Sequence, residues 1–324
     1  MSTENPPNDR PPPSEAEGGA AAATAHRRLE AVEILDLPPE LSPWTRARRR
    51  FMSHKLAVLG LAILFNMVLI AIFADFVAPY DPTRNHLHKL LAPPDSLNWL
   101  GTDRSGRDTF SRVVYGSRVS LSVGVVAVSI YLAIAFAIGA SAGLAGGRVD
   151  NVLMRFTDLI MTFPSFILIV IMAGILGPSI INVMVIIGIF GWPGLARLIR
   201  GQILVQRELD YVIASQALGG SLRHIIRRHV LPNVVGPVSV AVTLGVAGAI
   251  LAEAGLSFLG LGISEPAASW GTMISNARGI AFIDAAPALW LSPGLSIVLA
   301  VLAIYFVGDG LRDAFDVRGS GSGN

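Results

Sequence analysis

Long runs without a charged residue dominate the chain from residue 56 onward. A helix of about 20 apolar residues crosses the roughly 30 Å hydrocarbon core of a bilayer. Four runs approach or exceed that length, and each predicts one membrane-spanning helix: Leu56–Phe73, Val119–Gly147, Val230–Ala252 and Ala285–Gly308.

A fifth run, Leu159–Ala196, is about twice too long for a single span. Gly177-Pro178-Ser179 near its middle is a turn signal, so the run divides into two spans. The hydrophobic pattern therefore predicts an all-α, polytopic membrane protein with six transmembrane helices.

Lys and Arg near the helix ends orient the predicted spans, because cytoplasmic loops carry an excess of these residues. Residues 46–55 are rich in cations without an acid, and residues 197–229 carry six arginines, whereas residues 265–284 carry only Arg278. We therefore expect both termini in the cytoplasm. Residues 79–118 then lie outside, and we expect the aspartates and arginines of residues 101–118 to pair with one another and hold this loop. We also expect three tryptophans near the outer interface of the membrane: Trp99, Trp270 and Trp290.

Composition agrees with this class of protein. Hydrophobic residues make up 52% of the 324 residues, charged residues make up 15%, and the mean hydropathy is +0.58. A soluble protein averages about 25% charged residues. The net charge of +2 gives no reason to expect nucleic acid, and the absence of cysteine excludes disulfides and thiolate nucleophiles.

Motifs for chemistry on this chain are missing. The sequence contains no G-x-x-x-x-G-K-[ST] and no H-E-x-x-H, so we expect neither ATP hydrolysis nor a zinc protease site. His86 and His88 lie in a loop without convergent partners, and we expect no metal site there. The chain is therefore predicted not to be an enzyme, with no catalytic residue, cofactor or metal of its own.

The segment between the fourth and fifth spans has an unusual design. Apolar residues at helical spacing precede Gly219-Gly220, which should end a short helix. Ser221 can cap a second short helix, and Pro232 should stop that helix before the next span. The pattern alone allows two interpretations: a protruding helix pair that docks on a cytoplasmic partner, or a pair lying on anionic lipid.

Four residues of this segment, Ala214, Gly219, Leu231 and Pro232, match the "EAA" loop of binding-protein-dependent ABC importer permeases. The chain resembles that family here, although Ile213 replaces the glutamate and Ser215 the second alanine. In the family this loop is a coupling helix that docks on the ATPase subunit. The resemblance implies that residues 201–233 couple to an ATPase, with an apolar face formed by Leu209, Val212 and Leu218. The implied coupling residues are Arg207, Leu209, Asp210, Tyr211, Val212, Ala214, Ser215, Ala217, Leu218, Gly219, His229, Leu231 and Pro232.

Four further blocks, in family order, resemble the second permease subunit of the dipeptide/oligopeptide/nickel branch. They are Leu100–Asp108 with Tyr115–Arg118, Gly146–Pro164, Glu253–Gly271 and Gly308–Asp313. The resemblance covers residues 50 to 318 or so. It implies the fold of a type I ABC importer permease in a bacterial cytoplasmic (inner) membrane. It further implies alternating-access import of di- or oligopeptides, or else of a nickel chelate, glutathione or an oligosaccharide.

The same resemblance implies the partners. They are a homologous permease subunit, two ATP-binding cassette subunits that bind ATP and magnesium, and an extracytoplasmic solute-binding protein. Two other classes of function stay open from the sequence. One is a secondary transporter or channel that works without ATP, and the other is a membrane scaffold that recruits a cytoplasmic partner.

The predicted organisation has four parts. Residues 1–50 form a disordered cytoplasmic tail, and residues 51–118 form the first transmembrane helix with a structured extracytoplasmic loop. Residues 119–312 form a five-helix core that includes the coupling loop, and residues 313–324 form a flexible tail ending in Gly-Ser-Gly-Ser-Gly-Asn.

Two features inside the spans have alternative interpretations. Glu253 and Ser257 lie near the predicted outer end of their span, where they could form a gate or line the translocation path, or could make a structural hydrogen bond. Gly139, Gly143 and Gly147 recur every four residues, which permits close helix approach. They could line a moving subunit interface or serve ordinary packing.

Overall fold

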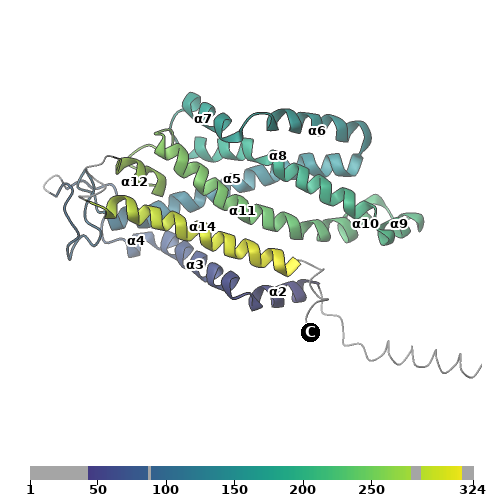
Figure 1. Ribbon diagram of the computed structural model, residues 1–324, viewed down its shortest axis with the longest axis horizontal. Helices are drawn as coiled ribbons and strands as arrows, with labels where there is room; N and C mark the ends of the chain where they lie inside the picture. Colours follow the sequence, from purple (N-terminus) through teal and green to yellow (C-terminus); the bar gives the residue numbers. More distant parts are fainter. Residues whose placement is uncertain (1–42, 87–88, 279–285, 316–324) are drawn as a thin grey trace, which may run out of the picture. The chain divides into compact units, whose positions relative to one another are not determined.

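The computed structural model describes residues 43–86, 89–278 and 286–315. The chain divides into two compact units, Met1–Arg46 and Ala47–Asn324. The described residues of the second unit are helical apart from connecting loops (Figure 1). The helices are α2 (Pro43–Ser53), α3 (Lys55–Ile72), α4 (Ala74–Val77), α5 (Thr109–Ala145), α6 (Gly147–Met161), α7 (Ser165–Leu176), α8 (Ile180–Arg207), α9 (Asp210–Ala217), α10 (Leu222–Ile225), the π-helix η1 (Ile226–Val230), α11 (Leu231–Phe258), α12 (Trp270–Asn276) and α14 (Ala288–Phe315).

The all-α, membrane-spanning architecture predicted from the sequence is confirmed. Within the described residues, α3, α5, α8, α11 and α14 are each long and apolar enough to cross a membrane. The pair α6 and α7, bent by 74° at its break, adds a sixth span if it is counted as one.

The third predicted span is not a straight helix. Its break falls at residues 162–164, where Pro164 precedes the first residue of α7 in a non-helical conformation. Proline lacks a backbone N–H and pushes the preceding residue, Phe163, away from helical angles.

The predicted tail 1–50 needs correction at its end, because α2 begins at Pro43. Residues 1–42 lie outside the described part of the chain, and so does the predicted C-terminal tail beyond Phe315.

Pro232 does not stop the helix before the fifth span, contrary to the prediction. Leu222 to Phe258 run on without a break through α10, η1 and α11. The π-type turn shifts the hydrogen bonds ahead of the proline, with the backbone N–H of Leu231 donating to the carbonyl oxygen of Ile226. Pro232 directly follows this π-type turn, and such a local change of hydrogen-bond pattern lets a continuous helix accommodate the missing N–H of proline.

The glycines of α5 serve packing inside this chain. A Cβ on Gly139 would lie 2.4 Å from the carbonyl oxygen of Ala196 in α8, and one on Gly143 would lie 3.0 Å from Ile203. The α5 backbone thus approaches α8 at van der Waals distance, which only glycine permits. The packing interpretation holds for these two glycines.

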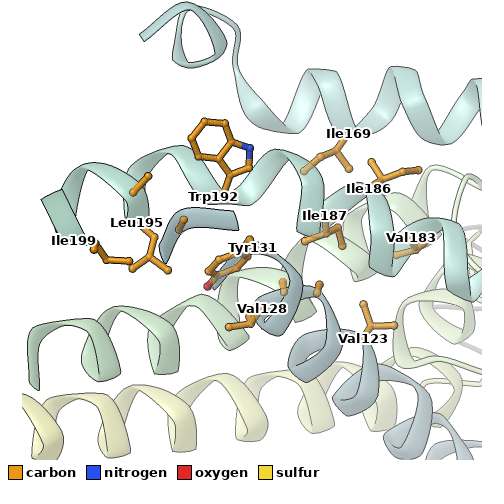
Figure 2. Close-up of a cluster of buried hydrophobic side chains, with 14 of the residues drawn as sticks. Val123, Val128, Tyr131, Ile169, Val183, Ile186, Ile187, Trp192, Leu195 and Ile199 are labelled. Carbon is orange, nitrogen blue, oxygen red and sulfur yellow. The ribbon is translucent and has the colours of Figure 1, made fainter. Parts of the chain in front are cut away.

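The main core lies where α5, α7, α8 and α11 meet. Val123, Val128 and Tyr131 of α5 are buried against Ile187 and Leu195 of α8 (Figure 2). Figure 1 shows α11 between α8 and α14, with α3 beyond α14. Large apolar side chains on α3 and α14 are exposed, as expected of surfaces that face lipid or another subunit.

Candidate functional site

Residues 201–233, which we call the coupling segment, are held by their own apolar side chains. Val212 of α9 has no exposed area, and Ile225 and Val230 are also buried. All three belong to the main core, and Leu209 packs against it. The segment is therefore a continuation of the helical core rather than a loop that lies free on the surface.

The outward face of α9 differs from the predicted one. Leu218 is 89% exposed and Tyr211 is 45% exposed, and Ala214 between them is exposed as well. Spacings of three and four residues place these side chains on one face of a helix. Of the face predicted from sequence, Leu218 is exposed, Val212 is fully buried, and Leu209 is half-buried against the main core.

The turn after α9 ends the helix as predicted. Gly219 has a φ of +82°, and the backbone N–H of Gly220 donates to the carbonyl oxygen of Ser215 at 2.9 Å. This is the left-handed glycine cap of a helix C-terminus. A Cβ on Gly220 would lie 2.6 Å from that Ser215 oxygen, whereas a Cβ on Gly219 would meet no atom within 4 Å. The space around Gly219 is open.

Side-chain hydrogen bonds join the parts of the coupling segment to one another and, through Arg207, join the segment to α5. Arg207 Nη1 donates to the carbonyl oxygens of Gly143 and Leu144, at 2.8 and 3.1 Å, and so neutralises the C-terminal end of α5. The Tyr211 hydroxyl donates to Gln206 at 3.0 Å and accepts from Asn233 at 3.4 Å. The α9 helix is thus hydrogen-bonded to the ends of α8 and α11, and the end of α8 is hydrogen-bonded to the end of α5.

The remaining predicted coupling residues lie around these anchors. Asp210 begins α9, where a negative charge is favourable, and Ala217 is exposed beside Leu218. Ser221 caps α10 as predicted, with its Oγ accepting from the His224 N–H at 3.3 Å. His229 lies in η1, and Leu231 and Pro232 are exposed in the first turn of α11.

Two ion pairs that the sequence did not predict hold α6 against α8. The Arg200 guanidinium donates two hydrogen bonds to the Asp150 carboxylate, at 2.5 and 2.6 Å, and Arg197 forms an ion pair with Asp158. The partners lie 50 and 39 residues apart in the chain, so no local spacing indicates the pairing.

Glu253 and Ser257 lie in a buried polar cluster at the other end of α11. Glu253 has no exposed area, and its carboxylate accepts from the hydroxyls of Ser257, Ser269 and Ser120 at 2.7, 2.7 and 3.3 Å. The Trp270 N–H donates to Ser120 at 3.2 Å. The cluster joins α11 to α5 and α12, a geometry that favours the structural interpretation of Glu253 over contact with a substrate.

Trp270 is not at an interface with lipid, contrary to the prediction. It is almost completely buried, it donates its indole N–H to the carbonyl oxygen of Val113 at 3.1 Å, and it stands over Gly116. Trp99 and Trp290 are at least partly exposed.

The prediction that the charges of residues 101–118 pair with one another holds in part: Arg107 pairs with Asp103, whereas Arg118 pairs with Asp75 outside the segment. Arg107 donates to Asp103 at 2.7 Å and to both carboxylate oxygens of Glu265 at 3.0 and 3.2 Å. Hydrogen bonds from Arg107 hold the pKa of Glu265 below its usual range, outweighing the opposite effect of burial. These bonds tie the segment before α5 to the segment after α11.

A cavity that the sequence analysis missed opens between α5, α7, α8 and α11. Its volume is about 430 Å³, and four of its lining residues are glycines: Gly191, Gly194, Gly245 and Gly248. Polar side chains contribute only the hydroxyls of Tyr131 and Ser165. A Cβ on Gly245 would lie 1.5 Å from the Tyr131 hydroxyl oxygen, so glycine makes room for the tyrosine, which Figure 2 shows within the main core. The sequence signal that could have indicated this cavity is the spacing of three residues within each glycine pair, which places both glycines on one helix face.

Comparisons with known proteins bear on this arrangement. Residues 135–319 match the model of the binding-protein-dependent transport system inner membrane component. Residues 42–94 match the N-terminal transmembrane domain of oligopeptide transport permease C.

Three relatives match over most of their length. A Brucella suis protein named as a peptide permease is 44% identical over 87% of this chain and 93% of its own. The dipeptide transport system permease of Alkalihalophilus pseudofirmus is 41% identical over 87% of this chain and 93% of its own length. The oligopeptide transport system permease of Bacillus subtilis is 38% identical over 86% of this chain and 90% of its own length. The family resemblance identified from the sequence blocks is confirmed.

Proposed function

Because the chain belongs to the family of binding-protein-dependent transport system inner membrane components, we propose that it is a pore-forming permease subunit of an ATP-driven importer. One observation carries the mechanism: the exposed stripe formed by Tyr211, Ala214 and Leu218 is tied through the Tyr211 hydroxyl to the last turn of α8 and the first turn of α11, two of the helices that line the cavity. A protein that docks on the stripe can therefore act on the cavity.

The stripe Tyr211–Ala214–Leu218 is the surface on which an ATP-binding subunit docks. Its large exposed apolar area is unusual for a segment that water would otherwise surround. The exposed cations Arg227 and Arg228 lie on the following helix, so an acidic rim on the partner would complement them. Nucleotide binding can shift the permease between conformations only if the docked contacts differ between those conformations.

The cavity is this chain's share of the translocation path. A wall made of glycine backbone and apolar side chains, with few fixed charges, suits solutes that share a backbone and differ in their side chains. In the proposed mechanism of alternating access, movement of α5, α8 and α11 opens this wall to one side of the membrane and then to the other.

Di- and oligopeptides are the proposed solutes, on the strength of the named relatives. A nickel chelate, glutathione or an oligosaccharide is the alternative cargo. We propose that both termini and the coupling segment face the cytoplasm and that α12 and residues 79–108 face outward. The proposed partners are a homologous permease subunit, two ATP-binding subunits that carry the ATP and magnesium, and a solute-binding protein outside.

The test is ATP hydrolysis by the complex purified through this chain and placed in nanodiscs. We expect an ATPase subunit to copurify, and its activity to rise when binding protein loaded with a mixed pool of di- and oligopeptides is added. A copurified ATPase that responds to glutathione or a nickel chelate but not to peptides would redirect the substrate. A complex without any ATPase would contradict the proposal.

A further inference from the structure

A second, smaller cavity lies at the end of the molecule opposite the coupling segment, beside α12 (Figure 1). It has a volume of about 210 Å³. The first turn of α5 forms one wall, and Glu265 with the end of α12 forms another. Three arginines line it, Arg104, Arg107 and Arg112, against two carboxylates, Asp103 and Glu265. The described lining thus carries one positive charge in excess.

Both carboxylates are already engaged by Arg107. That guanidinium donates to Asp103 through Nε and to Glu265 through both terminal nitrogens. Glu265 also accepts from Asn276 at 2.6 Å. The negative charges of Asp103 and Glu265 are therefore largely neutralised by Arg107.

Arg112 is buried without comparable partners. It is 1% exposed, and its one hydrogen bond to the described chain runs from Nη1 to the carbonyl oxygen of Pro82 at 3.3 Å. Its Nε is 3.5 Å from Asp103, and its Nη2 is 3.9 Å from Glu265 and has no hydrogen-bond partner among the described residues. A buried guanidinium with unused donors is costly, because it has lost its water without gaining acceptors.

A second donor at the same cavity is also unused. Thr109 is fully buried three residues before Arg112, and its hydroxyl has no partner within the described chain. Two buried donors without acceptors thus line one cavity, next to a neutralised ion network. Both groups could donate a hydrogen bond to an acceptor supplied from outside the described chain.

We infer that this cavity is a binding site for a carboxylate group, held by the Arg112 guanidinium and the Thr109 hydroxyl. A guanidinium binds a carboxylate with charge-assisted hydrogen bonds, and the hydroxyl can donate a further bond. The Arg112 guanidinium is itself charged, which favours an anion over a neutral acceptor.

The proposed function, on which this inference rests, supplies two sources of the carboxylate. One is the C-terminus of a peptide handed over at the outer face. The other is an Asp or Glu side chain of the docked solute-binding protein. Both present the same chemistry to Arg112 and Thr109.

Thr109→Val is the deciding variant, because it keeps the shape of the side chain and removes only the hydroxyl. That hydroxyl has no partner in the described chain, so a purely structural role predicts an unchanged or higher melting temperature and unchanged binding. We expect an unchanged melting temperature and basal ATPase activity. We also expect affinity for the binding protein to fall about tenfold, the effect of losing one hydrogen bond to a charged group.

The measurement is biolayer interferometry of binding protein on nanodisc complexes, with a non-hydrolysable ATP analogue and with the binding protein either empty or loaded with dialanine. Loss of affinity in both states assigns the carboxylate to the binding protein. Loss only in the loaded state assigns it to the peptide. Arg112→Gln should act in the same direction, and Arg84→Gln, an exposed cation of the same segment, should not change affinity.

Wild-type affinity of Thr109→Val in both states would overturn the inference and leave the cavity to water. That outcome is separable from failure of the proposed function, because copurification of the ATPase and its basal activity are read on the same complexes.

Discussion

Val212 lies in α9 and Leu218 directly follows that helix, and the two side chains have opposite environments. Leu218 is 89% exposed, whereas Val212 is fully buried. Leu218→Ser should therefore leave the melting temperature unchanged and reduce ATPase copurification at least fivefold. Val212→Ala should lower the free energy of unfolding by about 1–3 kcal/mol because it leaves a cavity. Thermal melts and quantitative immunoblots of the purified complex measure the two effects, and a matched loss of copurification in both variants at equal expression would contradict the assigned face.

Gly219 provides a test of docking that does not disturb the core. A Cβ at this position would meet no atom of the described chain within 4 Å, although the left-handed backbone would cost a leucine about 1–2 kcal/mol. We expect Gly219→Leu to insert normally and to lose peptide uptake, measured in proteoliposomes. Uptake at the wild-type rate would show that no partner approaches this turn.

Single residues were the hardest feature to predict from the sequence. The helix, its glycine end and the Ser221 cap were predicted correctly, but the three residues of the predicted apolar face have different environments, since Leu218 is exposed and Val212 is buried. Leu218 lies six residues after Val212, about one and two-thirds turns, so the two cannot share a face. Val212 and Leu209 are three residues apart and do share one, which the core covers. A list of apolar residues does not say which of two neighbouring surfaces each one contacts.

At the level of elements, the Arg107–Glu265 ion pair joins the segment before α5 to the segment after α11. Because the pKa of Glu265 is held below its ordinary value of 4.5, the ionised carboxylate stabilises the fold above that pH. This contribution is lost as the pH falls through the lowered pKa. Melting temperatures of the purified complex should therefore drop below pH 4.5, and Glu265→Gln should reduce that dependence. An identical pH profile in the variant would contradict the role of the pair.

Elements were well predicted where the hydrophobic signal is long. The spans around α3, α5, α11 and α14 follow from uncharged runs, and the Gly177-Pro178 turn separates α7 from α8. The break at Pro164 was missed because it falls inside an apolar run. The π-turn before Pro232 was missed because it depends on the backbone and not on the side-chain pattern.

At the scale of the whole molecule, the glycine-lined cavity is the feature most directly linked to transport. A Cβ on Gly248 would meet no atom of the described chain within 4 Å, and Gly248 lines the cavity, so we expect Gly248→Leu to fill part of it. We expect assembly and basal ATPase activity to persist and peptide uptake to fall at least tenfold. Gly174→Leu, at an exposed glycine of α7 that also has open space, is the matched control. Equal uptake by the two variants would exclude this cavity from the path.

The family and its general architecture followed from ordered sequence blocks, and these were confirmed. The cavity could not be predicted from the sequence, because its lining comes from four helices that meet only in the folded chain. The Arg–Asp pairs of α6 and α8 are missing from the prediction for the same reason.

The central claim is that α9 contacts an ATP-binding subunit and moves with it. The chain has no cysteine, so Leu218→Cys offers a single attachment point for a photoreactive benzophenone maleimide. We predict a crosslink to the copurified ATPase subunit whose yield changes between the nucleotide-free and ATP-trapped states, and none from Gly174→Cys. Absence of any crosslink from Leu218→Cys in an assembled, ATP-hydrolysing complex would contradict the claim.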